Sequence, residues 1–199
     1  MTRKKVAILI SGRGSNMSTL IEAARAPDYP AEIVGVLSNK ASAPGLEIAA
    51  AHGIATASLA QSKFPSRDMF EDTMTQVLES WGTEIVCLAG FMRILGEDFV
   101  TRWQGSMINI HPSLLPAYKG LDTHARALAD GATEHGCTVH FVTPGLDEGP
   151  AILQARVPVL AGDTPETLSA RVLVEEHRIY PEALRMLASG DAMFRPSLH

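Results

Sequence analysis

Two polar side chains, Asn109 and His111, stand in the segment over residues 107–112 and are of types that suit acyl-transfer chemistry. Residues two apart on a β-strand point to the same face, so we expect the amide and the imidazole to project together. An asparagine N–H stabilises a developing oxyanion, and a histidine carries protons near neutral pH. The alternative is a structural pair that closes a loop through hydrogen bonds, and these two residues alone leave both interpretations open.

Asp147 lies further along the chain, in the Gly- and Pro-containing turn over residues 146–150. An acidic residue in such a turn usually serves the turn itself. Together with Asn109 and His111 it becomes a candidate third member of one site. A carboxylate beside an imidazole stabilises the protonated ring and orders the path of a proton.

The run Ser11-Gly12-Arg13-Gly14-Ser15-Asn16 stands between a predicted strand and a predicted helix. Glycines let the backbone turn tightly there, and the N–H groups at the start of a helix hold a phosphate. Met17 occupies the place of the third glycine of a dinucleotide fingerprint, and the Gly-Lys-Ser/Thr run of a P-loop is missing. The pattern favours the monophosphate of a small ligand, with an ordinary turn that binds nothing as the alternative.

Glu176 falls on the apolar stripe of the last predicted helix. A carboxylate on a core-facing stripe is unusual and needs a partner. One interpretation is a buried pair with a nearby arginine, and the other is a contact with a substrate. The stripe consists of Leu168, Val172, Ile179, Ala183 and Leu187.

Alternating apolar and amphipathic segments predict the α/β elements that position these side chains. The last helix should begin at Thr164, a good N-cap that precedes a proline, and Pro181 should kink or split it. Prolines at 112 and 116 predict an irregular loop over residues 111–120. We expect strands over 5–10, 32–37, 54–58, 84–89, 106–110, 136–142 and 151–159, and helices over 15–26, 43–52, 66–81, 123–130 and 164–188.

Composition restricts the class of protein. The chain has 199 residues and a net charge of -5, which argues against many contacts with a long nucleic acid. Its apolar runs are far shorter than the roughly 20 residues that cross a bilayer. Cys87 and Cys137 lie apart within apolar segments, as buried reduced thiols do. We therefore expect one cytoplasmic domain over residues 1–199, with no nucleic-acid or membrane partner.

The segment Asn109-Ile110-His111-Pro112-Ser113-Leu114-Leu115-Pro116, with Asp147 downstream, resembles the folate-dependent formyltransferases. Residues 11–16, 37–40 and 88–95 narrow the resemblance to the members that act on glycinamide ribonucleotide. It implies a Rossmann-like, three-layer α/β fold with a mostly parallel sheet and helices on both faces. It also implies direct transfer of the formyl group of 10-formyltetrahydrofolate to the substrate amine, a step of purine biosynthesis, by a monomer or weak homodimer without a metal.

The resemblance assigns the substrates to different parts of the chain. The N-terminal half would bind the phosphoribosyl substrate, and the C-terminal half would carry the folate site and the catalytic residues. The assigned residues are Asn109, His111 and Asp147 for catalysis; Gly14, Ser15, Asn16, Gly90 and Glu176 for glycinamide ribonucleotide; and Arg67, Met92, Arg93, Ile94, Leu95 and Asn109 for the folate. Without the resemblance, residues 92–95 read as core and Arg67 as a solvated residue at a helix start.

The chain departs from the pattern of this family at two places. Asp122 stands where many relatives carry a histidine, and Pro144, Gly145 and Glu148 alter the turn around Asp147. The backbone of that turn is therefore less well predicted than the identity of Asp147 itself. Two further histidines, at 124 and 140, border the predicted site, and we expect structural roles for both.

Three competing functions follow from the same residues. A methionyl-tRNA formyltransferase would carry an additional C-terminal domain and a basic surface, and a formyltetrahydrofolate hydrolase would carry a regulatory domain in front. The length and charge of the chain disfavour both. A non-catalytic phosphate-binding α/β module would explain the glycine turn but would leave Asn109, His111, Asp147 and Glu176 unexplained.

Overall fold

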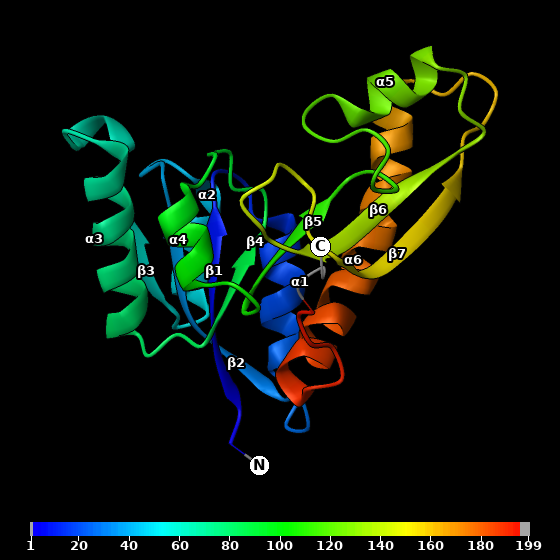
Figure 1. Cartoon of the computed structure of the whole chain (residues 1–199). Helices are drawn as coiled ribbons and strands as arrows, with labels where there is room; N and C mark the ends of the chain where they lie inside the picture. Colours follow the sequence, from blue (N-terminus) through cyan, green and yellow to red (C-terminus); the bar gives the residue numbers. More distant parts are fainter. Residues whose placement is uncertain (1, 196–199) are drawn as a thin grey trace.

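The protein forms a seven-stranded sheet with helices on both faces, described by a computed structural model for residues 2–195 (Figure 1). The strands are arranged in the order β3-β2-β1-β4-β5-β6-β7. Their bounds are β1 Lys4–Ile10, β2 Ala31–Ser38, β3 Ala55–Ser58, β4 Ile85–Leu88, β5 Met107–His111, β6 Glu134–Phe141 and β7 Ala151–Pro158. The helices are α1 Ser15–Ala24, α2 Pro44–Ala51, α3 Arg67–Ser80, α4 Glu97–Arg102, α5 Thr123–Ala129 and α6 Pro165–Ser189, with a 3-10 turn at Gln61–Lys63.

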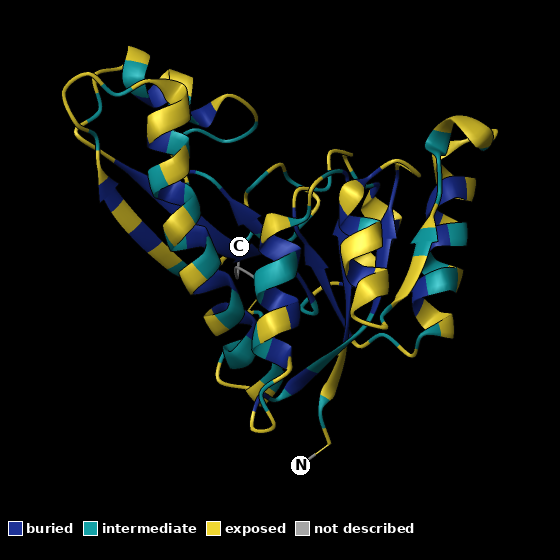
Figure 2. Ribbon diagram, turned by 180° about the vertical axis from the view of Figure 1, so that it is seen from behind, coloured by how far each residue is buried: buried dark blue, intermediate teal, exposed yellow. Residues whose placement is uncertain are grey.

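Strand β1 shows why the molecule has three layers. Alternate residues of a strand face opposite sides of a sheet, so Ile8 joins one apolar core and Leu9 joins the other. Helices α1, α2 and α6 cover the first face, and α3 and α4 cover the second. Figure 2 shows the central strands buried between helices whose outward faces are exposed, while the edge strands β3 and β7 are partly exposed. The predicted three-layer α/β fold is confirmed.

Strands β3, β2, β1, β4 and β5 are parallel, which brings their carboxyl ends to one edge of the sheet. The chain runs outward from β1 to β2 and β3 on one side, and returns to β4 on the other. The loops after β1 and β4 therefore diverge, and ligands of open α/β sheets bind in the crevice at such a point. Strand β6 is antiparallel to both β5 and β7, so the sheet is mostly parallel, as expected.

Helix α6 begins as predicted and differs from prediction at its middle. Thr164 is the N-cap and forms a reciprocal capping box with Thr167. Pro181 lies inside the helix without splitting it, which corrects one of the two expected outcomes. Buried side chains on both sides of the proline, among them Tyr180 and Leu184, anchor the helix to the sheet. Their burial outweighs the roughly 3 kcal/mol that an interior proline costs.

Helix α4 was not predicted from the sequence. It covers six residues, too few for apolar periodicity to stand out. The other predicted strands and helices are present and differ only at their ends.

Candidate active site

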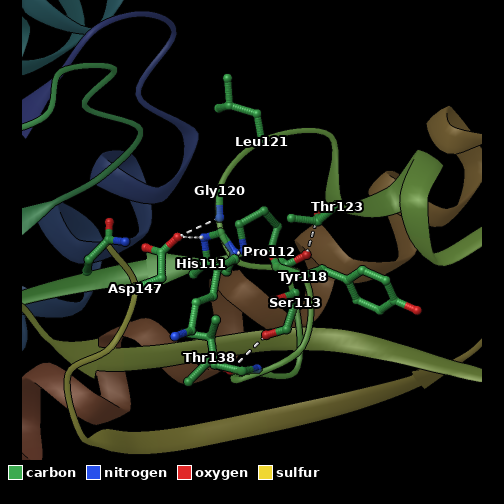
Figure 3. Close-up of polar contacts among 12 residues, drawn as sticks. His111, Pro112, Ser113, Tyr118, Gly120, Leu121, Thr123, Thr138 and Asp147 are labelled. Carbon is green, nitrogen blue, oxygen red and sulfur yellow. Dashed lines mark hydrogen bonds and ion pairs between the residues drawn. The ribbon is translucent and has the colours of Figure 1, made fainter. Parts of the chain in front are cut away.

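His111 and Asp147 lie beside each other at the carboxyl end of β5 (Figure 3). His140 links this pair to Asn109, because its Nε2 lies 3.2 Å from Nδ2 of Asn109 and 3.8 Å from Oδ1 of Asp147. Asn109 and His111 project from β5, and Asp147 enters from the loop between β6 and β7. Nδ1 of His111 lies 3.4 Å from Oδ2 of Asp147, and both side chains are almost completely shielded from solvent. The structure thus brings together the amide, the imidazole and the carboxylate that the sequence singled out.

The position of Asp147 depends on backbone contacts. Its Oδ2 accepts a 2.8 Å hydrogen bond from the N–H of Gly120, and its backbone is left-handed, with φ 51°. Aspartate tolerates this conformation better than most residues. At Gly149 a Cβ atom would lie 1.7 Å from the carbonyl oxygen of Phe141, so only glycine lets the loop approach the end of β6. The hydrogen bond from Gly120 and the close approach of Gly149 to β6 therefore fix the position of the Asp147 carboxylate.

Both ring nitrogens of His111 face acceptors. Nε2 lies 2.9 Å from the carbonyl oxygen of Tyr118, and Nδ1 faces Asp147. A carbonyl can only accept, so Nε2 carries a hydrogen. A hydrogen on Nδ1 as well gives the imidazolium, which complements the carboxylate. Both N–H groups then face these two acceptors, so such a ring acts on a developing negative charge through its positive charge.

His140 also borders the site, although we expected only a structural role for it. Its Nδ1 lies 2.9 Å from the carbonyl oxygen of Phe141 and must donate to it. In the neutral ring Nε2 then accepts from Nδ2 of Asn109, 3.2 Å away. Burial lowers the pKa of His140, which favours the neutral ring. His140 thereby orients the amide of Asn109.

The glycine turn leaves the first backbone N–H groups of α1 available. Gly14 is the N-cap with φ 74°, a conformation that favours glycine. Within residues 2–195, no side chain caps this helix and no acidic residue stands in its first turn. The N–H groups at the positive end of the helix dipole therefore have no side-chain cap, and they suit an anion.

Asn16, in the first turn of α1, contacts Glu176 on α6. Nδ2 of Asn16 donates a 2.7 Å hydrogen bond to Oε2 of Glu176, and both side chains are buried. Burial raises the pKa of Glu176, and the bond from Asn16 opposes that shift. In the described part of the chain Glu176 pairs with no arginine, so the arginine alternative is wrong. Oδ1 of Asn16 is buried without a described partner, an acceptor suited to a ligand N–H.

The loop between β4 and α4 presents apolar side chains to solvent. Met92 is 62% exposed and Ile94 is 78% exposed, while Arg93 is exposed and Leu95 is partly buried against the second core. The interpretation as core is wrong for residues 92–94, which are exposed, whereas Leu95 does pack against the second core. Arg67 is exposed at the start of α3, as expected.

A family comparison decides what kind of protein carries this site. The sequence profile described as formyl transferase matches residues 4–184, which is nearly the whole chain.

The chain belongs to the formyl transferase family.

Similar proteins support this family assignment. The chain is 48% identical to a phosphoribosylglycinamide formyltransferase from Escherichia coli (strain K12), over 93% of this chain and 87% of that protein. A crystal structure of phosphoribosylglycinamide formyltransferase from Brucella melitensis is 52% identical, with a TM-score of 0.91, and the match covers 98% of this chain and 100% of that chain. A glycinamide ribonucleotide transformylase 1 from Symbiobacterium toebii is 44% identical, with a TM-score of 0.94, over 98% of this chain and 92% of that one.

Larger proteins also contain a matching region. A trifunctional purine biosynthetic protein adenosine-3 from Bos taurus is 51% identical over 94% of this chain. This formyl transferase spans only 19% of the length of that relative.

Sequence reasoning overlooked His135 in this formyl transferase. His135 is buried on β6, and its Nε2 lies 3.1 Å from Nδ1 of His124 on α5. Burial lowers the pKa of His135 to about 4 and also lowers that of His124. The sequence around His135 does not indicate that His124 is its partner, because the two rings meet only when α5 packs near β6.

Tyr180 of α6 supports the strands that carry the site. Its hydroxyl is buried and donates to the carbonyl oxygen of Leu88, 2.8 Å away, with that of Ile108 at 3.3 Å. Leu88 is the last residue of β4, and Ile108 lies within β5, directly before Asn109. The helix therefore contacts the backbone of both β4 and β5.

Residues 2–195 contain no group of three or more His, Cys, Asp or Glu side chains placed to hold a metal ion. Within the same range, no helix of this formyl transferase has the length and apolarity needed to cross a bilayer.

Proposed function

We propose that the protein transfers the formyl group of 10-formyltetrahydrofolate to the amine of glycinamide ribonucleotide, a step of purine biosynthesis. The observation that carries the proposal is the contact of His111 with Asp147 at the carboxyl end of β5, on the strand that also carries Asn109. This end lies at the same edge of the parallel sheet as the uncapped start of α1. The names of the relatives support the same substrates.

The phosphoribosyl substrate fits the side of the site formed by α1 and α6. Its phosphate binds the backbone N–H groups of Gly14, Ser15 and Asn16, where the helix dipole favours an anion. Its glycinamide amine lies near Glu176, where a buried carboxylate and the free Oδ1 of Asn16 both accept hydrogen bonds. Gly90, left-handed with φ 75° after β4, borders the same space.

The folate fits the other side. Its pterin ring lies against the apolar side chains of the loop over residues 92–95, whose exposed surface it would cover. Arg67 stands at the edge of this surface and contacts the folate. Asn109 lies between the two substrates, because β5 pairs directly with β4.

The reaction is a direct acyl transfer. The substrate nitrogen attacks the formyl carbon, and the new C–N bond gives a tetrahedral intermediate with a negative oxygen. The amide N–H of Asn109 and the protonated ring of His111 stabilise that oxygen. Asp147 accepts the proton that the attacking nitrogen loses, through water, and His111 and Asp147 deliver a proton to N10 of the folate as the carbon–N10 bond breaks.

We also infer the location, oligomeric state and partners of the protein. It acts in the cytoplasm, as a monomer or weak homodimer, with tetrahydrofolate as the released product. Its chemistry needs no metal, because Asn109 and His111 supply the charge stabilisation. It binds neither nucleic acid nor membrane, consistent with a net charge of -5.

One assay tests the proposal. Purified protein is mixed with glycinamide ribonucleotide and a 10-formyl folate, and the deformylated folate is followed by absorbance. We expect turnover only when glycinamide ribonucleotide is present. Equal turnover with water alone would indicate a hydrolase, and turnover with Met-tRNA would indicate the tRNA enzyme; either result overturns the assignment.

A further inference from the structure

The loop over residues 90–96 packs against the second core only through the partly buried Phe91 and Leu95, as far as the described residues show. It connects the end of β4 to the start of α4 without regular structure, and Met92 and Ile94 point mostly into solvent. A loop with exposed side chains gains little from burial, so its conformation must come from other contacts. Two buried side chains supply hydrogen bonds to its backbone.

The first is Ser11, which follows β1. Its Oγ accepts a 2.8 Å hydrogen bond from the backbone N–H of Met92 and donates one of 2.5 Å to Oδ1 of Asn39. Ser11 and Asn39 are both buried. Strand β1 lies between β2 and β4, so a side chain at its end reaches the loops that follow both neighbours. Ser11 also begins the glycine turn, and one hydroxyl therefore joins that turn to the apolar loop.

The second is Glu71 on α3. Its Oε1 accepts a 2.7 Å hydrogen bond from the backbone N–H of Gly96, and its side chain is only 7% exposed. Nε of Arg67 lies 3.9 Å from the same oxygen. A Cβ at position 96 would lie 2.6 Å from Oε2 of Glu71 and 3.2 Å from Nε of Arg67. A larger residue at 96 would therefore push the ends of the Glu71 and Arg67 side chains aside.

We propose that Ser11 and Glu71 are positioning residues, which anchor the two ends of the loop over residues 92–96 in its folate-binding conformation. Ser11 also couples this loop to the phosphate-binding turn. This inference rests on the proposed function for its folate part. Neither side chain needs to touch the reacting atoms. Each fixes a backbone N–H, so the loop is already shaped before the folate arrives and the ordering cost of binding falls.

The burial of Glu71 supports a specific role. Burial raises the pKa of its carboxyl, while the bond from Gly96 and the nearby charge of Arg67 oppose the shift. A buried ionised carboxylate lowers the stability of the fold unless hydrogen bonds and charges offset its desolvation. Here these contacts come from the N–H of Gly96 in the loop and from Arg67, which is predicted to bind the folate. If Glu71 served only the packing of α3, an apolar residue of similar volume could replace it without lowering the stability of the fold.

The test uses variants that remove or keep each acceptor. Ser11→Ala and Glu71→Met remove it, while Ser11→Thr and Glu71→Gln keep an oxygen in place. Ser38→Ala is the matched control for the serine, because Ser38 is equally buried at the end of β2 but bonds only the N–H of Lys40. Asp72→Asn, an exposed acid next to Glu71, is the control on α3.

The first measurement is amide hydrogen exchange by NMR in the protein without ligand. We expect the N–H groups of Met92 and Gly96 to be protected, although their loop is exposed. Ser11→Ala should speed exchange at Met92 about tenfold, the equivalent of losing one hydrogen bond, and Glu71→Met should do the same at Gly96. Rapid exchange at both amides in the wild-type protein overturns the proposal.

The second measurement separates binding from chemistry. Both acceptor-removing variants should raise KM for the 10-formyl folate about tenfold with little change in kcat, because a positioning loss weakens binding first. Only Ser11→Ala should also raise KM for glycinamide ribonucleotide, since only Ser11 joins both loops. Recovery in Ser11→Thr and Glu71→Gln supports the anchoring role.

The outcomes distinguish the two proposals. If the wild-type protein turns over the folate and the two variants keep the KM values of the Ser38→Ala and Asp72→Asn controls, the anchoring proposal is wrong and the function stands. A wild-type protein that binds no 10-formyl folate overturns the function, and with it the folate part of this inference.

Discussion

Asn109 and His140 face each other across the ladder between β5 and β6, and the amide nitrogen of Asn109 lies 3.2 Å from Nε2 of His140. The other ring nitrogen of His140 donates to the carbonyl of Phe141, so the ring can only accept from Asn109 when it is neutral. One hydrogen of the Asn109 amide is thus committed to the histidine, and the other remains for an oxyanion. The antiparallel register decides which way the amide points.

The first prediction concerns this pair. His140→Phe should lower kcat about ten- to hundredfold, because a catalytic group misplaced by ~1 Å costs up to ~10²-fold. Adding Asn109→Ala should slow the enzyme no further than Asn109→Ala alone, since both changes remove one amide contact. Steady-state kinetics of the two single variants and the double variant measure the coupling. Additive losses would contradict the orienting role. Val139→Ala, at a neighbouring buried position of β6, controls for lost stability.

The second prediction concerns Asp147. Asp147→Asn keeps the size of the side chain and an oxygen for the N–H of Gly120, but it cannot accept the proton from the attacking nitrogen. We expect kcat to fall ~10²–10⁴-fold, the usual contribution of a general acid–base group. Circular dichroism and thermal unfolding should show a wild-type fold. Near-normal kcat in the folded variant would overturn the catalytic assignment. Asp28→Asn, at an exposed position, serves as the control.

The third prediction follows from the burial of Glu176. Its folded-state pKa is raised, so its contribution to stability is full below the unfolded pKa and is lost as pH rises through the folded pKa. At pH 7–8 the buried charge therefore weakens folding. Glu176→Gln should raise stability by about 1 kcal/mol, or ~2–4 °C in Tm, while KM for glycinamide ribonucleotide rises.

Differential scanning calorimetry and steady-state kinetics together test this third prediction. The gain in Tm should disappear near pH 4, where the wild-type carboxyl is protonated as well. Glu175→Gln, on the neighbouring position that pairs with Arg178, controls for a general effect of removing charge from α6. A lower Tm for Glu176→Gln at pH 7.5 would contradict the burial argument.

The fourth prediction concerns pH and His135. Its folded-state pKa of about 4 lies below its ordinary value of 6.5, so the unfolded chain binds more protons between these values. Stability should therefore fall as pH drops from 6.5 toward 4. His135→Gln, which has no proton to gain, should show a shallower loss in urea unfolding over that range. His52→Gln, at an exposed position, should follow the wild type. Parallel curves for wild type and His135→Gln would contradict this account.

Local patterns in the sequence were enough to predict most of the fold. Buried strands, the glycine turn and the Thr164–Pro165 helix start depend on neighbours in the chain, so apolar periodicity and capping chemistry reveal them. Asn109 and His111 were recognisable for the same reason, because a strand sends residues two apart to one face. The short helix α4 and the uninterrupted course of α6 through Pro181 were not predictable, since both depend on what packs against them.

The sequence alone determined which chemical groups are present and which of them lie together on one element. Only the tertiary structure decided which groups from distant segments meet: His140 with Asn109, Asn16 with Glu176, and Ser11 with Met92. It also decided that Met92 and Ile94 are exposed rather than buried. The physical reason is that burial and hydrogen-bond partners are properties of the packed chain. An apolar or polar side chain does not itself specify the distant surface that covers it.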